Sequence, residues 1–155
     1  RISQELGIPI SESKILIEDY FNTYPGIKKY IDDTIHKAYS DGYVSTLNGR
    51  KRKCRFSTNK MVNKAEERAA INMPIQGTAA ELIKIAMINL ENDIKRNGLS
   101  SKMILQVHDE LLFEVPENEI EVIAPIIVRQ MEAAIQINVP ITVDWNYGAN
   151  WFEAH

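Results

Sequence analysis

Residues 106–116 read Gln-Val-His-Asp-Glu-Leu-Leu-Phe-Glu-Val-Pro, and this stretch decides the fold. Apolar side chains dominate residues 103–107 and 111–115, and the polar centre between them consists of His108, Asp109 and Glu110. This pattern predicts two half-buried strands joined by a tight polar turn. Because carboxylates are costly to bury without partners, we expect the turn at the surface of a packed sheet. From the residues alone, the turn is either a reactive site or an ordinary solvated turn, in which Asp is common.

Four stretches of the chain resemble, in order, the family A DNA polymerases, the DNA polymerase I type. Residues 106–116 resemble the last catalytic motif of that family, which lies on a hairpin of the palm. Residues 67–80 (ERAAINMPIQGTAA) resemble the long palm helix before that hairpin. Residues 148–155 (GANWFEAH) resemble the closing segment, and residues 1–9 (RISQELGIP) the piece that follows the nucleotide-binding helix of the fingers. The resemblance therefore covers nearly the whole chain.

This resemblance implies an α+β fold, with an antiparallel palm-type sheet and a catalytic β-hairpin packed against long helices. It implies five segments within one C-terminal polymerase fragment: fingers-derived helices in 1–42, a basic hairpin in 43–57, a long palm helix in 61–98, the catalytic hairpin in 101–116, and a closing helix and strand in 117–155.

Local patterns predict the ends of these elements. Ser11 has the character of a helix N-cap, Pro25 interrupts the following helix, and Gly42 ends the next one. The aromatic residues of these helices fall on an apolar stripe, which favours a place in the core over a base-stacking role. Asn118 is expected to cap a later helix, and the alternation in 140–147 predicts a strand.

The resemblance also implies a role for each residue of the polar turn. In the family, the Asp of this hairpin is one of two carboxylates that hold the catalytic metal ions, so Asp109 is the expected ligand. We expect two Mg²⁺ ions in the complete enzyme, because two-metal phosphoryl transfer requires a pair of ions about 3.5–4 Å apart. Glu110 is expected to support the site. His108 is expected to contact the sugar or phosphate at the primer terminus, since Mg²⁺ prefers oxygen ligands.

Arg68, Asn72 and Gln76 follow one another at four-residue spacing, so on a helix they project from one face over about 12 Å. An ordinary amphipathic helix accounts for this pattern. All three side chains also offer hydrogen-bond donors, and every correct base pair presents acceptors at similar places in the minor groove. The resemblance assigns them contacts with the minor groove near the primer terminus.

Basic residues are concentrated in one part of a chain whose net charge is -3. Between Gly42 and Ala65 there is no acidic residue, and Asn48-Gly49 predicts a hairpin with a type I′ turn in this region. The run is either a solvated charged strand or a clamp on the phosphate backbone of DNA, and the resemblance favours the clamp. Its expected DNA-binding residues are Arg50, Lys51, Arg52 and Lys53.

The remaining expectations concern the protein to which the chain belongs. A start at Arg1, within an element, predicts a fragment of a longer protein. The Asp-x-Ser-x-x-Glu motif that supplies the partner carboxylate in the family does not occur in the sequence, nor does the Arg-x-x-x-Lys helix that binds dNTP. We therefore expect primer-template DNA and dNTP as partners of the complete enzyme, and a fragment that is inactive alone and self-associates through an unpaired sheet edge.

A single cysteine suits a reducing cytosol, and no apolar run is long enough to span a membrane, so we expect a cytoplasmic protein of the bacterial cytosol or nucleoid. Two other hypotheses remain open. One is a non-catalytic DNA-binding or interaction module that uses the basic hairpin. The other is a metal-dependent nuclease or phosphatase, which three scattered histidines support poorly.

Overall fold

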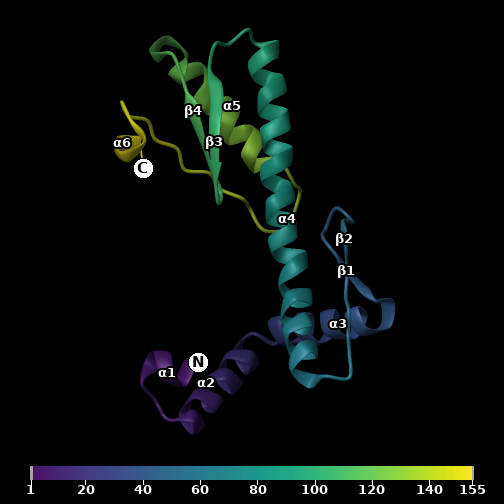
Figure 1. Ribbon diagram of the computed structural model, residues 1–155. Helices are drawn as coiled ribbons and strands as arrows, with labels where there is room; N and C mark the ends of the chain where they lie inside the picture. Colours follow the sequence, from purple (N-terminus) through teal and green to yellow (C-terminus); the bar gives the residue numbers. More distant parts are fainter. Residues whose placement is uncertain (1, 155) are drawn as a thin grey trace. The chain divides into compact units, whose positions relative to one another are not determined.

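The computed structural model describes residues 2–154 and divides the chain into two compact units, Arg1–Gly77 and Thr78–His155 (Figure 1). The outermost residues of the two terminal stretches that resemble the family, Arg1 and His155, lie outside the described residues. Helices predominate, and the strands form two separate antiparallel pairs. The α+β class predicted from the sequence is therefore confirmed.

The first unit begins with three helices, α1 (Ile2–Leu6), α2 (Ile10–Thr23) and α3 (Pro25–Asp41). The break before Pro25 and the end at Gly42 are as predicted, and Gly42 has a φ of 73°, which glycine adopts without strain. The predicted N-cap is wrong, because Ser11 lies within α2 and Pro9 occupies the cap position.

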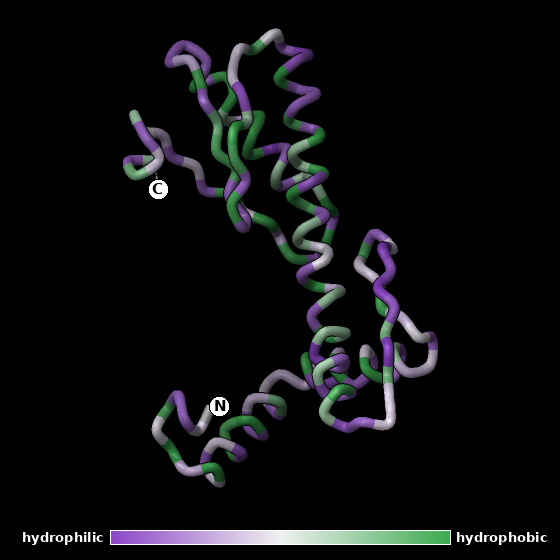
Figure 2. The backbone as a smooth tube through the Cα atoms, in the orientation of Figure 1, coloured by the Kyte–Doolittle hydropathy of each residue, from purple (hydrophilic) through white to green (hydrophobic). Residues whose placement is uncertain are grey.

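Figure 2 shows several hydrophobic residues along α2. Many of their side chains are exposed, so the prediction that the aromatic residues form the core is wrong in part. Tyr20 and Tyr24 are exposed to 47% and 53%, and their rings contact each other. Tyr30 is half-buried, and its hydroxyl donates a hydrogen bond to the carbonyl oxygen of Ile71 at 2.9 Å. Helical periodicity shows which residues share a face of α2, but it cannot say whether the described residues supply anything to cover that face.

The basic hairpin consists of β1 (Tyr43–Ser45) and β2 (Lys51–Lys53), with Val44 opposite Arg52. Its connection differs from the predicted type I′ turn. Thr46 and Arg50 are joined by a backbone hydrogen bond across three intervening residues, and only Gly49 of these has a positive φ, 85°. This is the pattern of a three-residue hairpin loop that places glycine in the left-handed region.

Helix α4 (Lys60–Arg96) is the longest element, and it runs through Pro74 without interruption. In the first unit, its Ala70 is buried against Ala38 and Val44, so that α3, β1 and α4 share one small apolar core. Its C-terminal end is as predicted. Gly98, with a φ of 64°, donates to the carbonyl of Lys95, and Leu99 donates to that of Ile94, which is the Schellman pattern.

The second unit is built on a hairpin of β3 (Lys102–Val107) and β4 (Glu110–Glu114), followed by the 3₁₀ turn η1 (Glu117–Glu119) and helix α5 (Ile120–Glu132). One face of the hairpin packs with α5 against the second half of α4 (Figure 1). The buried residues at the centre of this core are Ile83, Ala86, Leu90 and Met131.

The closing segment differs from the prediction in two places, at Asn118 and in 140–147. Asn118 lies inside η1 instead of capping a helix. Helix α5 contains Pro125. No strand forms in 140–147, although Val143 packs partly on the core, and the chain ends with the short helix α6 (Trp151–Ala154). An alternating pattern becomes a strand only when a neighbour accepts its hydrogen bonds, and within residues 2–154 no strand pairs with this segment.

None of the helices described in residues 2–154 is long and apolar enough to cross a membrane.

Candidate functional site

The turn of the second hairpin holds the predicted reactive residues at its tip. Val107 pairs with Glu110, so His108 and Asp109 alone form the connection, and Glu110 is the first residue of β4. All three polar side chains are exposed. The sequence therefore predicted the position of this turn correctly, with Glu110 one residue beyond it.

His108 has a φ of 51°, and it is the only residue other than glycine with a positive φ in the described part of the chain. This conformation costs a non-glycine residue roughly 1–2 kcal/mol. The side chain of Gln106 helps to hold it, because its Nε2 donates a hydrogen bond to the carbonyl oxygen of His108 at 2.6 Å. The positive φ of His108 therefore lies immediately before Asp109, in the two-residue connection of the hairpin.

Apolar packing at the base of the hairpin supports this tip. Met103 lies opposite Phe113 in the register, and both pack with Leu111 on the core made by α4 and α5. The neighbouring residue Ile104 interrupts the regular register and is exposed to 54%. One face of the hairpin is thus anchored, while the other face and the tip remain accessible.

The Glu119 carboxylate binds the residues that directly precede β3. Glu119, at the end of η1, accepts hydrogen bonds from the backbone N–H groups of Ser100 and Ser101 and from the hydroxyl of Ser101, at 2.6–3.0 Å. These donors, led by the N–H of Ser100, lower the pKa of the Glu119 carboxyl below its usual 4.5. Sequence reasoning missed this residue, because nothing in a lone Glu after a proline indicates which distant N–H groups it accepts.

The predicted row of donors lies on α4 in the first unit. Arg68, Asn72 and Gln76 are all exposed, as a surface that reads the minor groove requires. Four-residue spacing on a continuous helix keeps the three side chains on one face.

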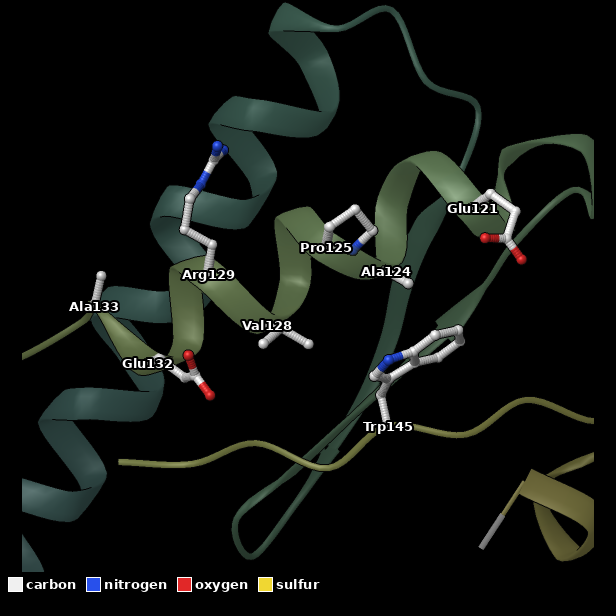
Figure 3. A pocket seen from close by; sticks show the side chains of 8 residues that line it. All are labelled: Glu121, Ala124, Pro125, Val128, Arg129, Glu132, Ala133 and Trp145. Atoms are coloured by element: carbon white, nitrogen blue, oxygen red, sulfur yellow. The ribbon is translucent and has the colours of Figure 1, made fainter. Parts of the chain in front are cut away.

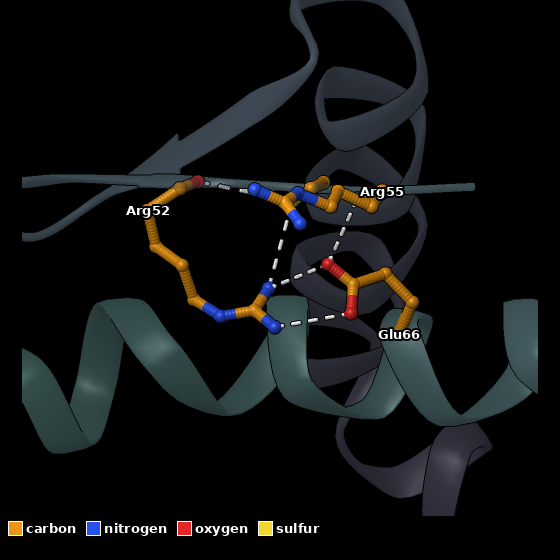
Figure 4. A network of polar contacts seen from close by, with 4 residues as sticks. Arg52, Arg55 and Glu66 are labelled. Atoms are coloured by element: carbon orange, nitrogen blue, oxygen red, sulfur yellow. Dashed lines mark hydrogen bonds and ion pairs between the residues drawn. The ribbon is translucent and has the colours of Figure 1, made fainter.

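The four basic residues of the first hairpin have different surroundings. Arg50, Lys51 and Lys53 are exposed, and the Lys51 ammonium lies 4.2 Å from the centre of the Tyr43 ring. Arg52 instead points toward α4. Its guanidinium donates two hydrogen bonds to the Glu66 carboxylate on that helix, at 2.8 and 3.0 Å (Figure 4). The backbone N–H of Arg55 donates to the same carboxylate.

The bidentate contact with Arg52 lowers the pKa of the Glu66 carboxyl, and the same contact raises the pKa of the arginine. Arg52 therefore has a structural partner inside the chain, and its role as a phosphate ligand remains a prediction. Sequence reasoning placed all four cations in one class because the acidic partner lies outside the acid-free run.

No group of three or more His, Cys, Asp or Glu side chains with the geometry of a metal site occurs in residues 2–154. Glu81 on α4 has a buried Oε2 that lacks a hydrogen-bond partner there, but no such group surrounds it. At the tip, Asp109 and Glu110 offer exposed carboxylates, which fit a cation that retains water and takes one or two protein ligands.

A hollow of about 720 Å³ is lined by residues of α5 and by the Trp145 ring, which faces that helix (Figure 3). Its charged lining residues are Glu121, Arg129 and Glu132. Because it contains none of the residues predicted to bind metal or DNA, we do not assign it to the candidate site.

Comparison with known proteins matches residues 1–153 to DNA polymerase family A. The chain belongs to this family. It is 45% identical to DNA polymerase I of Deinococcus radiodurans and 44% identical to DNA polymerase I of Streptococcus pneumoniae, with 99% of the chain aligned in each case. The aligned region spans only 16% and 18% of those two polymerases.

A solved structure of the POL domain of Pol1 from M. smegmatis, in complex with DNA primer-template and dNTP, is 44% identical and superposes with a TM-score of 0.95. The match covers 98% of this chain and 27% of that one. The family resemblance drawn from the four sequence stretches is therefore confirmed.

We predict that Glu119→Gln lowers the urea midpoint of the second unit near neutral pH, because a neutral amide accepts the Ser100 and Ser101 donors less well than a carboxylate. A folded-state pKa below 4.5 means that the stabilisation is complete above this pH and is lost as the pH falls through the folded pKa. The difference from the unsubstituted chain should therefore shrink on acidification. Fluorescence of Trp145 and Trp151 reports unfolding of this unit, since these are the only tryptophans.

Glu117→Gln is the matched control, because it removes an exposed carboxylate from the same 3₁₀ turn. It should leave the midpoint almost unchanged. A Glu119→Gln effect that stays constant between neutral and acidic pH would contradict the assigned role of the charge.

Proposed function

We propose that the chain is the C-terminal part of the catalytic domain of a DNA-directed DNA polymerase, which transfers nucleotides from dNTP to a primer 3′-hydroxyl under the direction of a template. Membership of DNA polymerase family A carries this proposal. The strained, exposed turn of His108 and Asp109 supports it, since unusual backbone conformations concentrate at functional sites. We place the complete enzyme in the bacterial cytosol or nucleoid.

Asp109 is proposed to bind Mg²⁺ as one of two carboxylates of a two-metal site. Exposure of its carboxylate at the hairpin tip suits this role, and Glu110 beside it would support the site. The second carboxylate would come from a part of the polymerase outside this sequence, because the Asp-x-Ser-x-x-Glu motif is absent here. When bound, the two ions would lower the pKa of the attacking hydroxyl and stabilise the leaving pyrophosphate.

His108 is proposed to contact the terminal sugar or phosphate of the primer. Its imidazole is exposed one residue before Asp109, so both side chains leave the same turn. The hydrogen bond from Gln106 to the His108 carbonyl would keep this turn in place when the primer binds.

DNA is proposed to contact two surfaces of the first unit. The donors of Arg68, Asn72 and Gln76 would test the shape of base pairs in the minor groove, where correct pairs share acceptor positions. The exposed cations of the basic hairpin, Lys51 and Lys53 above all, would neutralise backbone phosphates. Arg50 and Arg52 would add to this surface, although Arg52 must share its guanidinium with Glu66.

The second candidate function is a non-catalytic DNA-binding module, which the basic hairpin alone would satisfy. The two functions differ in their dependence on metal. Binding of a primer-template duplex that is indifferent to Mg²⁺, together with a complete enzyme that keeps its activity after Asp109→Ala, would favour the module.

We predict that the chain alone does not extend a primer in the presence of Mg²⁺ and dNTP, because it lacks the second carboxylate motif and the dNTP-binding helix. A primer-extension assay measures this directly. Extension that Asp109→Ala abolishes would show a complete active site in this chain and would reject the prediction.

We predict that Lys51→Ala and Lys53→Ala each weaken binding of a primer-template duplex and reduce the salt slope of log K by about one unit. The affinity is measured by fluorescence anisotropy between about 50 and 200 mM salt. Lys29→Ala is the control, because it removes an equal charge from α3 where Asp33 already pairs with the lysine. Equal slopes for all three variants would argue against the hairpin as a phosphate clamp.

We predict that the chain self-associates. In the described part of the chain, β3 and β4 each have one edge without a strand neighbour, and Ile104 and Leu105 are exposed on β3. Sedimentation at several concentrations should show a rising average mass that Ile104→Lys reduces and Ile88→Lys, on the exposed side of α4, does not. A single monomeric species throughout would contradict it.

A further inference from the structure

The basic hairpin is joined to α4 along one stripe of the helix. Arg52 bonds to Glu66 at one end of the stripe, Val44 packs on Ala70 in its middle, and Gly77 marks its other end. Residues 66, 70, 73 and 77 recur at intervals of four and three, which keeps them on one face of a helix. The hairpin therefore contacts α4 over about three helical turns.

Gly77 and Thr46 lie so close together that no residue larger than glycine fits at position 77 without a shift of its surroundings. A Cβ added to Gly77 would lie 2.7 Å from Cγ2 of Thr46, below the separation that such atoms adopt. Glycine is an unfavourable residue in the interior of a helix, so its presence here needs a reason in the packing. The contact with Thr46 supplies that reason.

Thr46 has little freedom to move away. It is 4% exposed, and a β-branched side chain has few rotamers. Its Oγ1 accepts the N–H of Arg50 at 3.0 Å, its N–H donates to the Arg50 carbonyl, and its own carbonyl accepts the N–H of Gly49. A displacement of Thr46 from Gly77 would therefore move the whole loop and the strand that carries Lys51.

The docking stripe leaves the row of donors uncovered. At about 100° per residue, Arg68, Asn72 and Gln76 lie roughly 130° around α4 from the stripe. Gln76 and Gly77 are adjacent in sequence, so the last donor of the row is next to the closest contact of the hairpin. Helix α4 thus presents the row of donors on one side, and on another side it contacts the hairpin that carries Lys51 and Lys53.

We propose that Gly77 and Thr46 are positioning residues that hold the basic hairpin in register along α4, so that Lys51 and Lys53 meet the backbone of the duplex whose minor groove the donor row contacts. This inference rests on the proposed function, because it assumes that both surfaces bind DNA. Neither residue needs to touch DNA, since each acts through the placement of the two lysines.

The test is a double-mutant cycle in the full chain, made of Gly77→Ala, Thr46→Ser and the double variant. Thr46→Ser removes Cγ2, with which the new methyl group collides, and keeps the hydroxyl that accepts the Arg50 N–H. Each variant is first checked for native circular dichroism. Binding of a fluorescent primer-template duplex is then measured against salt concentration.

Gly77→Ala should reduce the salt slope by about one to two units, the loss expected when one or both lysines leave their phosphates. The double variant should recover the slope of the unsubstituted chain, and Thr46→Ser alone should keep it. Gly26→Ala in α3 is the matched control, since a Cβ there meets nothing within 4 Å. If Gly77→Ala acted only by changing the stability of α4, the smaller side chain of Thr46→Ser would not restore the salt slope in the double variant.

Each other outcome is decisive. A folded Gly77→Ala variant with an unchanged slope would overturn the proposal, and so would a double variant as impaired as Gly77→Ala. If Gly77→Ala fails to fold, a folded double variant with the original slope supports the contact, and an unfolded one rejects it. Absence of salt-dependent binding by the unsubstituted chain would instead reject the proposed DNA-binding function, and the positioning role with it.

Discussion

Burial of one face of the β3–β4 hairpin is the interaction on which the candidate active site depends. A turn that carries a carboxylate and an imidazole gains nothing from the core, so something else must hold it in one place. Met103, Leu111 and Phe113, each partly buried, provide this hold by packing on α4 and α5. Each contributes a part of the roughly 1.5–3 kcal/mol that full burial of a large apolar side chain gives. The stabilisation is large enough to outweigh the positive φ of His108, which costs roughly 1–2 kcal/mol.

Charge placement accounts for a surface of exposed cations, proposed to bind DNA, on a chain whose net charge is -3. Alternation along β2 directs Arg52 toward α4 and leaves the two lysines on the opposite face. Glu66 neutralises the inward cation through two hydrogen bonds, so the hairpin can pack against the helix without an unpaired charge at the contact. The outward cations, Lys51 and Lys53, are exposed to solvent. Strand β2 thus packs on α4 through Arg52 on one face, and its other face presents the two lysines that are proposed to contact DNA.

The sequence predicted best where a single local cause determines the structure. Gly98 ends α4 because the Schellman pattern requires a left-handed residue, and the 106–116 turn forms because apolar runs on both sides of it bury the same face. Predictions that needed a distant partner were less successful. Asn118 has the right side chain for a cap, but Pro116 starts a 3₁₀ turn two residues earlier. The Asn-Gly pair indicated a hairpin correctly, but Arg50 pairs with Thr46, which makes the loop three residues long. Glu66, Glu119 and Thr46 escaped notice because their partners are set by the fold.

The apolar residues of α2 and the alternating segment 140–147 also show that a sequence pattern cannot predict whether a partner surface is present. Periodicity in sequence records which residues are suited to burial, and both segments have it. Burial also requires a surface to pack against, and strand formation requires a hydrogen-bonding neighbour; the described residues supply neither in full. By contrast, each of the two hairpins packs on α4 within the chain. The basic hairpin contacts the helix at Glu66 and Gly77. The β3–β4 hairpin packs on the core that contains Ile83 and Leu90. The two surfaces proposed for DNA and metal are therefore formed by contacts internal to each unit, even though the chain spans less than a fifth of the DNA polymerase I sequences that it matches.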